Sequence, residues 1–80
     1  MMNFPYDNPG VYAIHIAGRI ESSWVDCLGG LMVRYEEDSS GAPISVLKGT
    51  LPDQAALLGI LTALYNARFP LLFVRYIRSE

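Results

Sequence analysis

The sequence predicts an α+β domain in which a four-stranded sheet has one long helix on one face. Three observations predict this class. The chain has only 80 residues and 51% of them are hydrophobic, which indicates one small folded domain over residues 1–80. A single long helical pattern runs from Thr50 to Phe69. Three stretches of strand-like composition precede it and one follows, while residues 1–10 form an irregular lead-in.

The predicted helix has recognisable start and stop signals. Thr50 has the hydroxyl of an N-cap residue, and Asp53, three residues later, can complete a capping box. Pro52 is tolerated in the first turn, where its missing N–H costs nothing. Pro70 disfavours a helical conformation for the residue before it, and Arg68 suits the negative end of the helix dipole.

The faces of this helix are apolar on almost every side. At about 100° per residue, Leu57, Leu61 and Leu64 form one line that we expect to face the core. The residues that flank this line are Leu58 and Tyr65 on one side and Ala56, Ile60, Ala63 and Ala67 on the other. A domain of this size buries only about 60% of its unfolded surface. We therefore expect a second copy of the chain to cover part of the helix.

The first strand is expected from Val11 to Ile20. Tyr12, Ile14 and Ile16 alternate onto one face, and Val11, Ala13, His15 and Ala17 alternate onto the other. Both sets are largely apolar, which indicates a central strand. The stretch from Glu21 to Leu28 does not alternate and predicts a short helical turn that places Trp24 on the core.

The other three strands are shorter or less regular. Leu31–Glu37 should point Leu31, Val33 and Tyr35 inward and Met32, Arg34 and Glu36 outward. Residues 38–41 have the composition of a turn. Pro43 delays the next strand, Ile44–Gly49, or moves it to an edge. Pro70–Ile77, the last strand, is apolar on both faces.

Two strand orders fit these elements. In the favoured one, strands 1 to 3 form an antiparallel meander, and a right-handed crossover through the helix lays strand 4 beside strand 1. The alternative is a ferredoxin-like split, in which the short turn at residues 21–28 replaces the first helix. The short link between strands 1 and 2 favours the meander. In both orders one sheet face, which includes His15 and Met32, has no helix to cover it.

Composition excludes several classes of protein. The net charge of −2 argues against a nucleic-acid partner. The longest apolar runs fall short of the roughly 20 residues that cross a membrane, and the N-terminal residues lack the pattern of a signal peptide. The single cysteine, Cys27, excludes an internal disulfide framework and fits a reducing cytoplasm.

The helix and the strand after it resemble a known group of sequences. DQAALLGIL, from Asp53 to Leu61, followed by PLLFV is similar to small uncharacterised bacterial proteins with a D-Q-A-A-L-x-G-x-L helix and a P-L-x-x-V strand. The resemblance covers about residues 11–77 and implies a fold, since the group has no established activity. Leu58 stands where a histidine is common in the group, and Thr62, Ala63, Tyr65 and Asn66 stand where charged residues are usual. These departures make the helix more apolar and favour an interface.

The candidates for chemistry are few and isolated. His15, the only histidine, could act as a general base, but a lone histidine in a strand is more often a packing or interface residue. Cys27 could be a nucleophile, yet the neighbouring Asp26 would raise its pKa. One histidine and one cysteine with scattered acids lack the spacing of a metal site. An enzyme would need active-site residues that meet across a subunit boundary, with His15 and Asp26 or Cys27 as the candidates. We expect no catalytic residues, no cofactor and no metal.

The surplus of apolar surface predicts the function class. We expect a non-enzymatic homo-oligomer, most simply a dimer, that acts as a scaffold, adaptor or regulator. The residues expected at its interface are Leu58, Tyr65, Ile60, His15, Met32 and Tyr76. The alternative is a module that binds a small apolar molecule on the open sheet face or between subunits.

Overall fold

The computed structural model describes residues 8–79, apart from the side chains of Ser22, Val25 and Cys27. Most of the expected lead-in, residues 1–7, therefore lies outside the described residues. The elements, in chain order, are β1 (Gly10–Ala17), α1 (Ser22–Val25), the 3-10 segment η1 (Asp26–Leu28), β2 (Met32–Glu37), β3 (Pro43–Leu51), α2 (Gln54–Asn66) and β4 (Leu71–Ser79).

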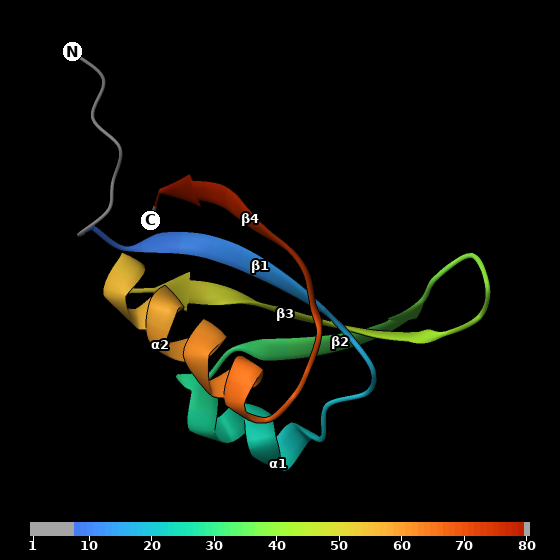
Figure 1. Ribbon diagram of the computed structural model, residues 1–80. Helices are drawn as coiled ribbons and strands as arrows, with labels where there is room; N and C mark the ends of the chain where they lie inside the picture. Colours follow the sequence, from blue (N-terminus) through green and yellow to red (C-terminus); the bar gives the residue numbers. More distant parts are fainter. Residues whose placement is uncertain (1–7, 80) are drawn as a thin grey trace.

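The four strands form one antiparallel sheet in the order β2-β3-β1-β4 (Figure 1). The α+β class, the single long helix and the position of β4 beside β1 are confirmed. The predicted meander is wrong, because β3 and not β2 lies beside β1. This is the order of the ferredoxin-like split, with α1 and η1 in place of its first helix. The link between β1 and β2 runs over residues 18–31 and is long enough for the crossover, whereas the shorter link between the predicted strands had favoured the meander.

The link leaves β1 at Gly18, whose φ of +100° favours glycine, and is then fastened to the sheet. The Ser45 hydroxyl accepts a hydrogen bond from the Ile20 amide at 3.0 Å and donates one to the Gly18 carbonyl at 2.8 Å. The Tyr35 hydroxyl donates to the Ile20 carbonyl at 2.6 Å. Ile20, expected at the end of the first strand, is instead fully buried in this link.

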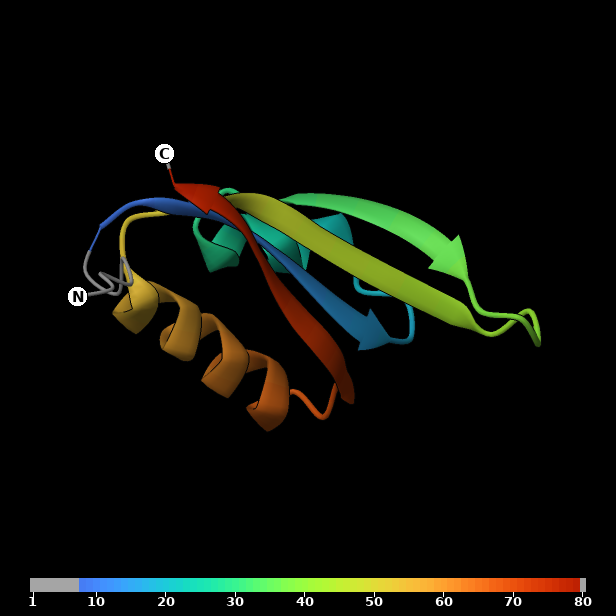
Figure 2. The ribbon, with the colours of Figure 1, turned by 90° about the horizontal axis from the view of Figure 1, so that it is seen from above.

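Both helical segments lie on one face of the sheet, and the other face stays open (Figure 2). The core fills the space between the sheet and the two helical segments. Its buried members are Tyr12, Ile14 and Ile16 from β1, Leu47 and Leu51 from β3, Ile60 and Leu64 from α2, and Ile20, Leu28 and Leu31 from the links. The inward positions of β1 are those expected from the alternation.

The helix is shorter than predicted at both ends. Asp53 is the N-cap, and its carboxylate accepts from the Ala56 amide at 2.8 Å. Thr50, the predicted cap, belongs to β3, because that strand continues to Leu51. At the other end Arg68 has a left-handed φ of +66°, so it follows the last helical turn instead of lying in it.

The inward line of α2 is rotated relative to the prediction. Ile60 and Leu64 are its buried residues, whereas Leu57 and Leu61 are only half-buried. The helix packs against α1 and η1 as well as the sheet, and Leu28 from η1 belongs to the same core cluster. Ile60, predicted at an interface, is therefore part of the core of the single chain.

Candidate interaction surface

Large apolar side chains that remain exposed gather on two elements. Six of the seven such residues that the structure describes belong to α2 or β4, and Met32 on β2 is the seventh. Their exposed fractions are 77% for Met32, 63% for Leu58, 80% for Tyr65, 51% for Leu71, 47% for Leu72, 49% for Phe73 and 42% for Tyr76. Contiguous exposed apolar surface of this kind marks interaction sites.

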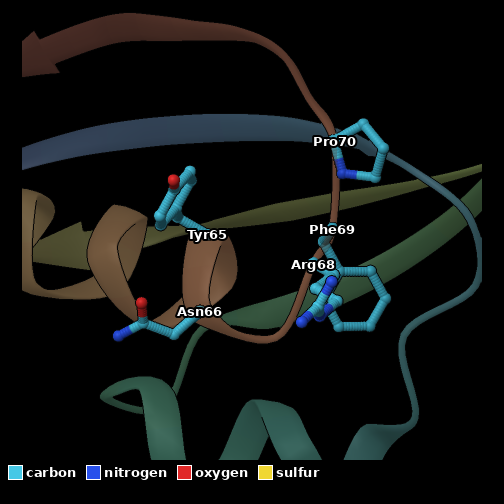
Figure 3. A pocket seen from close by; sticks show the side chains of 5 residues that line it. All are labelled: Tyr65, Asn66, Arg68, Phe69 and Pro70. Carbon is cyan, nitrogen blue, oxygen red and sulfur yellow. The ribbon is translucent and has the colours of Figure 1, made fainter.

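We call Leu58 and Tyr65 of α2 together with Leu71, Leu72 and Tyr76 of β4 the β4–α2 surface. Two cavities lie beside it, and the smaller one joins α2 to β4. One, of about 180 Å³, is lined by Leu61, Leu64, Tyr65, Phe69, Pro70 and Leu71. The other, of about 490 Å³, opens around the end of the helix and is lined by Tyr65, Asn66, Arg68, Phe69 and Pro70. In Figure 3 the first two of these residues project from the last turn of α2, and the other three come from the segment that leads into β4.

The strand β4 also forms an edge of the sheet. It has nine residues and pairs with β1 alone in the described sheet, so backbone groups along its other side face away from any strand. The opposite edge, β2, has six residues and a pair of charged side chains, Arg34 and Glu36, whose Nη2 and Oε2 atoms are 2.6 Å apart. Short length and charge protect an edge from pairing. Of the two edges, β4 is the less protected, because it has two charged residues among nine, Arg75 and Arg78, whereas β2 has three among six.

His15 lies on the open face of the sheet and stacks on Phe73, with ring centroids 3.9 Å apart and an interplanar angle of 20°. Its pKa is lowered, first by burial and then by the positive charges of Arg75 and Arg34, against an opposing effect of Glu36. Asp26 belongs to η1 on the other side of the sheet. The structure therefore does not bring His15 and Asp26 together within one chain, and the side chain of Cys27 lies outside the described residues.

The remaining predicted site residues are separated too. Met32 lies on the open face of the edge strand β2, and two strands separate it from Phe73 on β4. Tyr76 was expected at an interface. It packs edge-to-face on Tyr12, with ring centroids 5.3 Å apart, and therefore lies on the helix side of the sheet. A register shift between Val11 and Tyr12 sets this position.

A third cavity could not be anticipated from the sequence, because it depends on how α1 and η1 lie beside α2. It has a volume of about 360 Å³ and is lined by Leu28, Gly29, Leu51, Pro52, Ala56, Gly59, Ile60 and Ala63. Gly59 is unusual in the middle of a helix, where glycine costs about 1 kcal/mol relative to alanine. A Cβ atom at this position would meet nothing within 4 Å.

Neither a metal-binding cluster nor a membrane-spanning helix is found among the described residues. Within residues 8–79, the described side chains form no group of three or more His, Cys, Asp or Glu that could hold a metal ion. Among the described helices, none is long and apolar enough to cross a membrane.

Comparison with known proteins gives a family. No curated protein and no solved structure matches the chain. A family model described as "Domain of unknown function (DUF8691)" matches residues 11–75, which extend from the start of β1 into β4. Because this match covers well over half of the 80 residues, the chain belongs to that family.

Proposed function

We propose that this protein is a non-enzymatic interaction protein that forms a homodimer through the β4–α2 surface. One observation supports this most strongly: the less protected edge of the sheet lies directly beside the exposed apolar flank of the long helix. The separation of His15 from Asp26 by the sheet supports a function without catalysis. The single cysteine supports a reducing, cytoplasmic location.

The proposed dimer follows from the geometry of an edge strand. Two copies of β4 related by a two-fold axis pair antiparallel, so each copy presents the same surface to the other. This pairing satisfies the backbone groups on the outer side of β4 and joins two four-stranded sheets into one. The helices α2 then lie on the same side of the joined sheet, and Leu58 and Tyr65 face the seam between the copies.

The area that such an interface has to bury is a modest share of the chain's surface. A stable interface buries roughly 800 Å² on each partner. That area is about one seventh of the 5408 Å² accessible surface of the chain. A strand of nine residues spans about 30 Å, which gives the contact its length.

The test is to place the same charge on each of the two edges. Leu72→Lys on β4 should shift the protein to a monomer in size-exclusion chromatography, because a lysine would have to be buried at the seam. Met32→Lys on β2 is the matched control and should keep the dimer. If Met32→Lys dissociates the protein and Leu72→Lys does not, the interface is on β2 or the open face and the proposal is wrong.

A second candidate function is the binding of a small apolar molecule in the 360 Å³ groove between η1 and α2. The observation that favours it is Gly59, a helix glycine that no neighbouring atom requires. Gly59→Leu would fill the groove, whereas Thr62→Leu adds an apolar side chain at an exposed position of the same helix. Fluorescence of an environment-sensitive apolar dye should fall with the first variant and not with the second. Equal dye fluorescence in both variants would exclude the groove.

A further inference from the structure

The charges of this protein are unequally divided between the two sides of the sheet. Residues directly opposite one another on neighbouring strands share a face. By this rule the open face has four of the six Lys and Arg residues, namely Arg34, Lys48, Arg75 and Arg78. Among the described acidic residues it has only Glu36, which is paired with Arg34. The net charge of −2 therefore hides a face with an excess of positive charge.

Short side chains of β1 lie between these cations. The register places Ala13 directly between Lys48 on β3 and Arg75 on β4, and it places Arg78 opposite Val11. Val11 and Ala13 are short and each only 4% exposed, whereas the three cationic side chains are exposed. Strands lie about 4.8 Å apart, so the backbones of Lys48 and Arg75 are about 10 Å apart. Both side chains are long enough to reach one anion above Ala13.

An aromatic pair lies further along β1 on the same face. His15, two residues beyond Ala13 and therefore about 7 Å along the strand, stacks on Phe73. Phe73 is 49% exposed, so part of its ring is available to a further planar group. The open face therefore offers both cations and an exposed ring, the two features that single-stranded nucleic acids contact.

We propose that the open face binds a single-stranded nucleic acid, with a phosphate between Lys48 and Arg75 and a base against Phe73. Proteins that bind single strands combine a cationic groove with exposed rings on which bases stack. An acidic peptide would also meet the cations, but its Asp and Glu side chains have no aromatic ring to stack on Phe73. The argument from net charge against such a partner fails, because it averages over two faces of different charge. The inference is independent of the proposed dimer.

The experiment is fluorescence anisotropy with a fluorescein-labelled single-stranded oligonucleotide of mixed sequence, as RNA and as DNA. Arg75→Glu should weaken binding about tenfold or more. Arg68→Glu makes the same change in net charge at the end of α2, away from the open face, and should leave the affinity within about twofold. Lys48→Glu, which is not at the sheet edge, should match Arg75→Glu. Phe73→Leu should cost about fivefold or more through lost stacking.

Binding of RNA, DNA or both by the unchanged protein, weakening as salt is raised, would support the proposal. Circular dichroism should show the same secondary structure in every variant. Absence of binding to both oligonucleotides at low salt would overturn it. Equal losses in Arg75→Glu and Arg68→Glu would also overturn it, because the effect would then come from net charge alone. Equally strong competition by poly-glutamate would assign the face to acidic proteins instead.

Discussion

Leu58→Glu separates assembly of the dimer from folding of the single chain. Leu58 is 63% exposed, so the chain alone hides only about a third of this side chain from water. Full burial of a leucine is worth about 1.5–3 kcal/mol, and the substitution should therefore cost the monomer about 0.5–1 kcal/mol. At a closed seam the new carboxylate would lose its water without gaining a partner, at a cost of several kcal/mol. A cost of about 3 kcal/mol raises the dimer Kd roughly 100-fold.

The matched comparison is Leu64→Ala on the same helix. Leu64 is 2% exposed, and truncation of a buried leucine costs about 2–5 kcal/mol, a large part of the stability of a small domain. Leu61 would be a weaker comparison because it is only half-buried. Leu64→Ala should lower the urea midpoint strongly while its folded fraction still dimerises.

Size-exclusion chromatography and urea unfolding followed by circular dichroism measure the two effects side by side. The reasoning predicts a smaller species with full helical signal for Leu58→Glu. If Leu58→Glu lowers the urea midpoint as much as Leu64→Ala does, Leu58 contributes to the core and the exposed flank of α2 is not a free surface. If Leu58→Glu leaves a dimer intact, the interface lies elsewhere.

Three further predictions concern the folded chain. Gly59→Ala should raise the free energy of unfolding by about 0.5–1 kcal/mol, because nothing lies within 4 Å of the new Cβ atom; a loss in urea titration would show that the site requires glycine. Ser45→Ala removes the acceptor of the Ile20 amide and should cost about 1–3 kcal/mol, whereas Ser40→Ala at the exposed hairpin should stay within about 0.5 kcal/mol; equal effects would contradict the role of Ser45. His15 has a folded pKa below 6.5, so the unfolded chain binds its proton more readily and stability should fall as the pH drops below about 6.5. His15→Asn should reduce this dependence, and an identical pH profile for the variant would refute it.

The sequence was a good guide to what depends on local pattern. Alternation predicted which residues of β1 face the core, and the exposure of Leu58 and Tyr65 follows the helical projection. The helix cap was misplaced because Thr50 and Asp53 are both suitable caps, and only the length of β3 decides between them. The assignment of Ile60 failed because it depends on the packing of α2 against η1.

The strand order could not be read from pattern alone. In the structure β1 ends before Gly18, and the Ser45 hydroxyl on β3 binds the link at the Gly18 carbonyl. No local sequence pattern connects these two distant residues. The first strand was predicted to end three residues later than β1 does. The link to β2 therefore looked too short for a crossover, and the meander was favoured. The same misplacement concealed that β2, and not β3, is the edge strand beside the hairpin, and it concealed the composition of the open face, since both depend on which strands are neighbours.

The mass of the unchanged protein in solution tests the proposed dimer most directly. Multi-angle light scattering across micromolar concentrations should give about twice the chain mass of 8.9 kDa. The fraction of monomer should increase only on dilution. A mass that stays at 8.9 kDa up to about 100 μM would contradict the dimer, because a stable homodimer with a Kd in the micromolar range (about −8 kcal/mol) is fully formed at that concentration.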